Sequence, residues 1–539
     1  MNKTKTKKDA AVTWKINRLR KGDTPRVLDL FSGCGGLSLG FKTAGFEILG
    51  AAEIDKDAAS THGVNFFRNE TAEVQEHHSI PRDVHDEPEN LFSDLKLKNK
   101  SDRIVDVLVG GPPCQAFARI GRAKLRSEAH KKQSDYADDA FLQDERADLV
   151  WQYLRIVREL KPISILIENV PDVLNYGGQN VAELVCDELA NLGYTTGYTL
   201  LNSAFYGVPQ TRERMFLLAH RSELGIPVTW PEPTHFCQLP KGYDGTRATA
   251  LKHVLNKEQQ SLLKDIRHNF HHFEIPAADD KLEQAVTTRD ALGDLPRIMA
   301  LKDLRTGRLK RRAPKLDQTI TYDSNPHSGY SALMREWPGF DVERGVTAHV
   351  IRYLPRDYKI FKNMKEGWQY PQIWNWIEEK REKLIKKRIK EGKTVSSSDE
   401  EFQKFVREWT LPYDPSKFPN KWWKLLSSEP SRTLLAHLGK DTYSHIHYDS
   451  SQARTISVRE AARLQSFPDG FIFPGGMNAA FKQIGNAVPP LVAYAIARNI
   501  RSSLGINNLA DIREGYLWVK KRKRSRREFK EANATSDTT

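Results

Sequence analysis

The sequence contains no apolar run approaching the roughly 18 residues that a membrane helix needs, and its N-terminus lacks the apolar segment of a secretory signal. These absences predict a cytoplasmic protein without membrane spans. Cysteine is also scarce, and none of the four cysteines belongs to a C-x-x-C pair. That spacing argues against a zinc site or a disulfide framework, so no metal is expected and each cysteine is judged alone. The four are Cys34, Cys114, Cys186 and Cys237.

Positive charge is in excess, because 83 Lys and Arg residues face 69 Asp and Glu residues, for a net charge of +14. Such a balance favours a polyanionic partner, since Lys and Arg displace the counterions condensed on nucleic acid. A positive net charge alone does not prove this, because a basic protein can also lack a polyanionic partner. The length of 539 residues exceeds one usual hydrophobic core and predicts two domains, or one core with a large insertion.

From residue 25 to 221, short β-branched runs alternate with amphipathic stretches, which predicts an α/β domain with a parallel sheet. The predicted strands are Arg26–Leu30, Glu47–Ala52, Val105–Gly110, Ile163–Ile167, Thr195–Leu201 and Met215–Ala219. The predicted helices are Gly36–Ala44, Ala147–Leu160 and Val181–Leu192.

The alternation fades over residues 222–453, which predicts a second, less regular domain, and residues 454–505 return to a helical pattern that would pack on the first domain. Glu378–Lys393 has sparse apolar positions and is predicted as an exposed helix with a solvated face, in preference to a DNA contact. The basic tails, residues 1–24 and 506–539, are predicted as solvated and frayed, with contact to DNA backbone as the alternative.

A glycine-rich turn follows the first strand in the segment VLDLFSGCGGLSLGF, residues 27–41. Glycines let the backbone approach a ligand, and the helix after them offers free N–H groups to an anion. The segment lacks the G-x-G-x-x-G spacing of a dinucleotide site, so a structural turn stays open. Glu53 ends the second strand, where it could accept ribose hydroxyls, Ile54 could cover an adenine face, and Asp83 is a weaker candidate for the adenine amino group.

The segment DVLVGGPPCQ, residues 106–115, delivers Cys114 from an apolar strand through two stiff prolines. Free cysteine is often a buried small hydrophobe. A nucleophilic thiolate is the preferred interpretation, because ligands bind at the carboxyl ends of strands in open α/β sheets. The basic residues of segment 116–132, which is predicted to be a mobile loop, also favour a thiolate.

Four further segments carry notable polar residues. Glu168 ends the next strand, where burial would raise its pKa and let it share a proton with a ring nitrogen. Arg212 and Arg214 alternate in QTRER and can bind a carboxylate, a phosphate or a carbonyl oxygen. Asn486 in QIGNAVPP suits a turn that offers its amide to a ligand, and RTISVREAARLQSFP fits a capped structural helix.

Six motifs, in the order DLFSGCGG, GGPPCQ, ENV, QTRER, RTISVREAARLQSFP and QIGNAVPP, together resemble the motif series of the DNA cytosine-5 methyltransferases. The resemblance covers residues 27–214 and 454–500 and leaves the middle as a target-recognition region. It implies a Rossmann-like fold dependent on S-adenosylmethionine, with a mostly parallel seven-stranded sheet completed by the last helix. The cofactor residues that it implies are Phe31, Gly33, Gly35, Glu53, Ile54, Asp83, Pro112, Asn486 and Val488.

The resemblance also implies a reaction, in which Cys114 attacks C6 of a cytosine flipped out of double-stranded DNA and C5 is methylated. Glu168 would act at N3, and Arg214 with Arg212 at O2 or a nearby phosphate. A monomeric prokaryotic modification enzyme is expected, functionally paired with a restriction endonuclease.

Three alternatives to this reaction fit the sequence less well. An RNA cytosine methyltransferase is disfavoured by the long middle region and by the absence of a C-F-T triplet after Glu168–Val170. A catalytically silent DNA-binding protein is disfavoured because Cys114, Glu168, Arg212 and Arg214 are all retained. A nicotinamide-dependent dehydrogenase fails on the glycine spacing.

Overall fold

The computed structural model describes residues 9–86, 90–91, 95, 101–113, 148–240, 242–261, 271–311, 315–393, 399–411, 413–507 and 509–514. Cys114 and the predicted basic loop lie outside the described residues. The chain divides into two compact units: unit 1 comprises Met1–Ala285, Gln465–Phe467 and Ala487–Glu514, and unit 2 comprises Val286–Leu464, Pro468–Asn486 and Gly515–Thr539. The predicted domain boundaries after residues 221 and 453 do not coincide with these limits, and as functional divisions they stay predictions.

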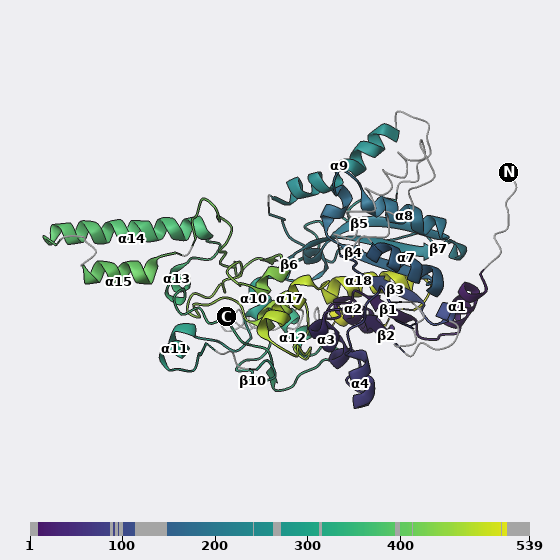
Figure 1. Ribbon diagram of the computed structural model, residues 1–539, viewed down its shortest axis with the longest axis horizontal. Helices are drawn as coiled ribbons and strands as arrows, with labels where there is room; N and C mark the ends of the chain where they lie inside the picture. Colours follow the sequence, from purple (N-terminus) through teal and green to yellow (C-terminus); the bar gives the residue numbers. More distant parts are fainter. Residues whose placement is uncertain are drawn as a thin grey trace, which may run out of the picture. The chain divides into compact units, whose positions relative to one another are not determined.

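Unit 1 contains a six-stranded sheet with the strand order β2-β1-β3-β4-β7-β5 (Figure 1). Its strands are β1 (Arg26–Leu30), β2 (Glu47–Ala52), β3 (Val107–Gly110), β4 (Ser164–Asn169), β5 (Tyr194–Asn202) and β7 (Glu213–Arg221). Neighbouring strands from β2 to β4 run parallel, whereas β7 is antiparallel to both β4 and β5. The mostly parallel α/β architecture confirms the predicted class; the predicted count of seven strands is not confirmed, because the described part of the chain forms six in this sheet.

In the part of unit 1 that the structure describes, the helices are α1 (Ala10–Arg20), α2 (Gly36–Thr43), α3 (Lys56–Phe66), α4 (Ala72–His78), α7 (Asp148–Leu160), α8 (Val181–Asn191), α9 (Gly242–Ser261) and α18 (Pro490–Ser503). Short elements are the 3-10 helices η1 (Ser101–Arg103), η3 (Pro171–Asn175), η4 (Ser203–Tyr206) and η5 (Ser222–Leu224), and the strands β6 (Gln210–Thr211), β8 (His235–Phe236) and β9 (Glu283–Gln284). The last of the helices, α18, packs against α2 (Figure 1). The prediction that the C-terminal helix returns to the first domain is therefore confirmed.

The core of unit 1 lies between the sheet and helices α7 and α8. Apolar residues of the central strands are fully buried, as expected for parallel strands covered on both faces. On α8, Val181, Val185 and Leu189 are buried in this core, and Leu184 and Leu192 pack partly against it. The helical spacing of these five residues is the pattern that predicted the helix.

Residues 10–20 correct one prediction, because they form the helix α1 rather than a solvated tail. Val12 and Leu19 are buried against Ile163, and Lys15 is fully buried. The Lys15 ammonium donates to the carbonyl oxygen of Leu160 at 2.6 Å, at the C-terminus of α7, where a helix attracts cations. Burial lowers the pKa of Lys15 to about 7. The many basic residues near the N-terminus concealed an amphipathic helix.

Unit 2 contains short helices and strands: α10 (Thr288–Leu292), α11 (Ala300–Arg305), β10 (Ile320–Thr321), α12 (Gly329–Arg335), β11 (Gly345–Val346), α13 (Tyr358–Asn363), α14 (Tyr370–Lys390), α15 (Glu400–Trp409), β12 (Ser431–Arg432), η6 (Ala436–Gly439), α16 (Val458–Leu464) and α17 (Met477–Asn486). Across the described part of both units, no helix combines the length and the apolar character needed to cross a membrane.

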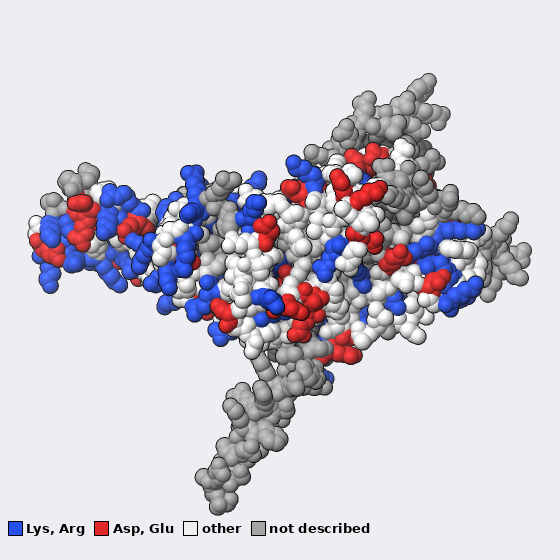
Figure 2. Space-filling view, turned by 90° about the horizontal axis from the view of Figure 1, so that it is seen from below, with Lys and Arg blue, Asp and Glu red and all other residues white. Residues whose placement is uncertain are grey.

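The longest helix of unit 2, α14, lies beside α15 (Figure 1). Its first turns bury Tyr370, Ile373 and Ile377 in an aromatic core. Figure 2 shows Lys and Arg side chains, with fewer acidic ones, over the far part of this helix pair. The predicted exposed helix is therefore confirmed over residues 378–390, and it begins earlier than predicted because the aromatic residues before it are buried.

Candidate active site

The turn after β1 brings backbone of unusual conformation to the carboxyl edge of the sheet. Phe31, Gly33 and Gly35 have φ angles of 56°, 54° and 96°, a region that residues other than glycine rarely adopt. Gly35 is the N-cap of α2. A methyl group built on Gly33 would have nothing within 4 Å, so this part of the turn borders open space.

Val488 contacts the first residue of α2. A Cβ atom built on Gly36 would lie only 2.1 Å from the carbonyl oxygen of Val488, so glycine alone permits this approach. Two segments of the predicted cofactor site, the glycine-rich turn and Val488, therefore meet within unit 1. Asn486 is exposed at the last residue of α17 and belongs to unit 2.

The carboxylate of Glu53 is held by two backbone N–H groups at the end of β2. Its Oε2 accepts from the Gly33 N–H at 2.8 Å and its Oε1 from the Asp55 N–H at 2.8 Å. The next side chain, Ile54, is 67% exposed although it is apolar. These contacts join the ends of β1 and β2.

Asp83 lies near the same edge, because the N–H of the preceding residue, Arg82, donates to the carbonyl oxygen of Glu53 at 2.9 Å. The Oδ1 atom of Asp83 accepts from the His85 N–H at 3.0 Å and lies 2.7 Å from the His85 ring Nδ1. The structure thus places the least regular of the predicted cofactor segments beside Glu53.

Sequence reasoning missed a buried polar group under the turn, at Asp29. The Ser38 hydroxyl donates to Asp29 Oδ2 at 2.6 Å and lies 3.0 Å from His62 Nε2. Burial raises the pKa of Asp29 to about 7. A carboxylate inside the otherwise apolar run VLDL was the available signal.

On the neighbouring strand ends, Glu168 is paired with Arg214. Arg214 Nε lies 3.2 Å from Glu168 Oε1. Burial raises the pKa of Glu168, and the charges of Arg214 and Arg212 act against that rise. Arg212 is only 1% exposed. The structure brings these three side chains together, and their catalytic roles stay proposals.

The backbone that leads to Cys114 passes directly beside Glu168. A Cβ atom built on Gly111 would lie 3.2 Å from Glu168 Oε2, and the Asn169 side chain donates to the carbonyl oxygen of Pro112 at 2.7 Å. The ends of β3 and β4 are therefore held together at the last described residues before Cys114. Pro112 is buried at this point.

Two other cysteines are unsuited to nucleophilic chemistry. Cys34 and Cys186 are fully buried, and burial raises the pKa of both thiols, which disfavours the reactive thiolate. Cys237 is half-buried.

Helix α9 supports the segment that carries the two arginines, which the sequence did not predict. The Tyr243 hydroxyl donates to the carbonyl oxygen of Thr211 at 2.5 Å. Arg247 donates from Nε and Nη2 to Glu213 Oε2 at 2.8 and 2.5 Å. Residues on both sides of Arg212 are thus anchored by a helix predicted to lie in the second domain, and α9 belongs to unit 1.

The motif RTISVREAARLQSFP supplies three arginines to the interior of unit 2. Arg454 pairs with both oxygens of Glu460 at 2.6 and 2.7 Å. Arg463 Nη1 donates to Asp294 Oδ1 at 2.5 Å, and its Nη2 to Asp469 Oδ2 at 2.6 Å. Arg459 donates to backbone carbonyl oxygens. These contacts are structural in kind.

A capping box begins α16 within the same motif. The Glu460 N–H donates to the Ser457 hydroxyl at 3.1 Å, and the Ser457 N–H donates back to Glu460 Oε2 at 2.7 Å. The predicted capped structural helix is therefore confirmed.

Comparison with known proteins identifies relatives along nearly the whole chain. The profile of the family described as C-5 cytosine-specific DNA methylase matches residues 25–502. A protein of Oceanobacillus iheyensis named as a type II methyltransferase is 37% identical over 486 residues, covering 89% of this chain and 96% of the relative. The type II methyltransferase M.AgeI of Thalassovita gelatinovora is 30% identical over 505 residues, covering 89% of this chain and 100% of the relative.

A solved structure titled as a prophage-encoded DNA modification methyltransferase from E. coli has a TM-score of 0.53 at 20% identity, covering 89% of this chain and 100% of its own. That likeness supports the fold alone. The family match and the sequence relatives agree with the motifs, so this chain belongs to the C-5 cytosine-specific DNA methylases and is a DNA (cytosine-5)-methyltransferase.

Proposed function

We propose that this enzyme methylates C5 of a cytosine extruded from duplex DNA, with Cys114 as covalent nucleophile and S-adenosylmethionine as methyl donor. The observation that carries the proposal is the pairing of Glu168 with Arg214 beside Gly111, three residues before Cys114. A half-buried carboxyl group with a raised pKa suits proton sharing with a ring nitrogen.

The residues proposed to hold the cofactor fit its chemistry. Gly33 borders open space, where a ligand can approach the backbone, and the N-terminus of α2 attracts a carboxylate. Glu53 can accept hydrogen bonds from ribose hydroxyls, and the exposed Ile54 offers an apolar face to adenine. When bound, S-adenosylmethionine supplies a methyl group on a positively charged sulfur. The remaining proposed residues are Phe31, Gly35, Asp83, Pro112, Asn486 and Val488.

The protein must first activate cytosine, because C5 is a poor nucleophile in the intact aromatic ring. Addition of the Cys114 thiolate to C6 forms a C–S bond and converts the ring to an enamine, while Glu168 holds a proton at N3. Arg214, together with Arg212, binds O2 or a neighbouring phosphate. Once C5 carries the methyl group, loss of the C5 proton breaks the C–S bond and frees Cys114.

A duplex with 5-fluorocytosine at the target position tests this mechanism, because fluorine cannot leave C5 as a cation and the covalent adduct persists. Wild-type enzyme supplied with S-adenosylmethionine is expected to methylate C5 and to form an adduct that survives denaturing electrophoresis. Cys114→Ala should lose both the adduct and methyl transfer to ordinary DNA while still binding DNA. The matched control, Cys237→Ala, should retain both activities. Normal turnover by Cys114→Ala would exclude Cys114 as nucleophile, and equal transfer to RNA would exclude DNA specificity.

We also propose that the enzyme serves a restriction-modification system as its modification partner. The proposal is supported by the names of the type II relatives. Bisulfite sequencing of DNA from cells expressing the protein would reveal the methylated sequence. That DNA is then expected to resist a restriction endonuclease of the same specificity, and methylation scattered over unrelated sequences would contradict the proposal.

A further inference from the structure

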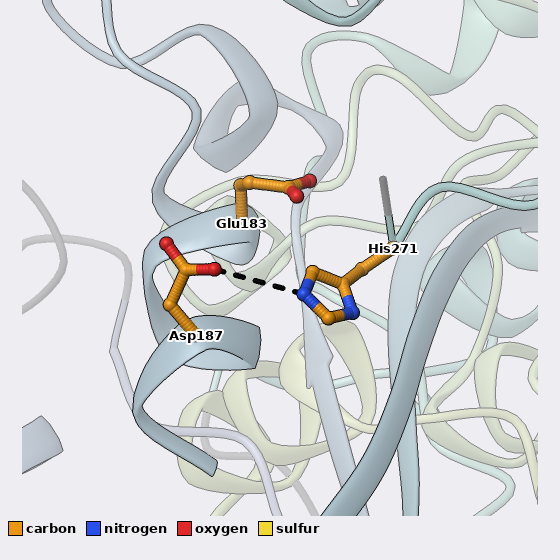
Figure 3. A group of neighbouring side chains, drawn as sticks. All are labelled: Glu183, Asp187 and His271. Carbon is orange, nitrogen blue, oxygen red and sulfur yellow. Dashed lines mark ion pairs between the residues drawn. The ribbon is translucent and has the colours of Figure 1, made fainter. Parts of the chain in front are cut away.

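A second group of ligand-type side chains lies away from the residues of the proposed reaction, on α8 and the segment beside β5. One oxygen each of Glu183 and Asp187 and one ring nitrogen of His271 lie within 4.8 Å of one another. Figure 3 shows the two carboxylates projecting from successive turns of α8 and the imidazole approaching from the other side.

An ordinary ion pair accounts poorly for this arrangement. His271 Nε2 lies 3.6 Å from Asp187 Oδ1, which is too long for a hydrogen bond. Two ligands of one tetrahedral zinc ion are separated by about 3.3 Å, given bonds of about 2.0–2.1 Å. Small side-chain rotations would therefore bring all three atoms to bonding distance of one ion.

Glu183 is the member that most requires a cation. It is 6% exposed, and in the described residues it forms no ion pair with Lys or Arg. One of its oxygens, Oε2, accepts from the neutral Tyr198 hydroxyl at 2.8 Å, which supplies no positive charge. A buried carboxylate beside a second carboxylate is costly without a compensating positive charge.

The groups around the cluster orient its members as outer partners orient metal ligands. His271 Nδ1 lies 2.8 Å from the Thr196 hydroxyl, and the tautomer that donates from Nδ1 to this hydroxyl has Nε2 available for coordination. The Asn180 side chain donates to Tyr198 at 2.8 Å, and Tyr198 donates to Glu183. Such hydrogen bonds fix the tautomer and direction of metal ligands.

We propose that Glu183, Asp187 and His271 bind a divalent transition-metal ion, with Zn²⁺ preferred, as a structural site. An imidazole with two carboxylates suits Zn²⁺, whereas Mg²⁺ and Ca²⁺ favour six or more oxygen ligands. The prediction that no metal binds was based on the spacing of the cysteines, which gives no information about His, Asp and Glu ligands. Water completes the coordination on the side of Asp187, whose side chain is 46% exposed.

The ion would fasten the segment that begins at His271 to the body of unit 1. The Tyr198 N–H donates to the carbonyl oxygen of His271, and the Phe273 N–H donates to that of Tyr198, both at 2.8 Å. His271 therefore sits where this segment joins the edge of β5. Metal occupancy is expected to raise stability, because an ion that binds only the folded protein shifts the unfolding equilibrium.

Calorimetry on the untagged full chain, stripped of metal with a chelator, tests the site with Zn²⁺ alone. Wild-type protein is expected to bind one Zn²⁺ with a rise in melting temperature of at least about 2 °C. Asp187→Asn and His271→Ala should each lose this binding and this rise. Thr196→Val should weaken Zn²⁺ binding by about 10–100-fold, since it removes the hydroxyl beside Nδ1 and leaves the three ligands in place.

The matched control is His437→Ala. His437 forms a 2.9 Å ion pair with Asp441 that lacks the second carboxylate of the cluster, so Zn²⁺ binding should be unchanged. The Asp187 side chain is partly exposed, so Asp187→Asn is expected to fold even if His271→Ala does not. Absence of Zn²⁺ binding by the wild-type chain, or equal binding by Asp187→Asn, would overturn the proposal.

Discussion

The contact between α2 and Val488 permits a test in which two physical effects predict stability changes of opposite sign for one substitution. Replacing Gly36, the first residue of α2, with alanine would stabilise an unobstructed helix by up to about 1 kcal/mol. In this fold the new Cβ would stand 2.1 Å from the Val488 carbonyl oxygen. The oxygen belongs to the backbone and the Cβ is fixed rigidly to it, so the two segments must separate by more than about 1 Å to reach an ordinary contact. Overpacking of this kind costs about 1–3 kcal/mol, and net destabilisation of about 1–2 kcal/mol is expected.

Thermal denaturation measures the sign of the stability change caused by Gly36→Ala, with Gly242→Ala as the control. Gly242 is the first residue of α9, and a methyl group there has nothing within 4 Å, so that variant should be unchanged or slightly stabilised. Gly36→Ala should also weaken S-adenosylmethionine binding by about tenfold, equivalent to 1.4 kcal/mol, because both displaced segments belong to the proposed cofactor site. A Gly36→Ala protein as stable as Gly242→Ala would refute the close approach.

Three further predictions follow from buried charges. Glu168→Gln removes the shared proton but keeps the shape, and methyl transfer should fall about 10²–10⁴-fold with cofactor affinity unchanged by calorimetry; unaltered turnover would exclude Glu168 from proton transfer. Arg247→Ala leaves Glu213 buried without its partner and should cost about 2–4 kcal/mol in urea unfolding, whereas Arg247→Ala with Glu213→Gln should recover part of it; strict additivity would contradict the pairing. Burial raises the pKa of Asp29 to about 7, so its protonated form favours folding and stability is lost as pH rises from about 4 towards 7, by at most about 1.4 kcal/mol per unit. The stability of Asp29→Asn relative to the wild type should therefore increase as pH rises over that range. A stability difference that does not depend on pH would show that Asp29 does not titrate there.

The sequence predicted the elements whose signals are local. Arg26–Leu30 and Glu47–Ala52 are strands with the predicted bounds, because each is a short apolar run that ends at a turn. The alignment of Glu168 with the strand that leads to Cys114 was also predictable, since parallel strands present their carboxyl ends at one edge.

Contacts between distant segments left no such signal. The bond from Tyr243 to Thr211 and the pairing of Arg247 with Glu213 join a strand region to a helix in a stretch without regular alternation. Helix α1 was missed for a related reason. The many basic residues near the N-terminus indicated a solvated tail, although the spacing of Val12 and Leu19 fits one face of a helix. These features depend on tertiary packing that periodicity does not encode.

The buried Arg463 has a consequence for exchanging recognition regions between related enzymes. One of its two carboxylate partners, Asp469, is close in sequence, but the other, Asp294, lies 169 positions earlier, in the region expected to vary with target sequence. A transplanted recognition region must therefore bring its own carboxylate to this point. A graft that lacks it would leave a guanidinium buried with half of its compensation, so the choice of junction, rather than the DNA-contacting residues, would decide whether the chimera folds.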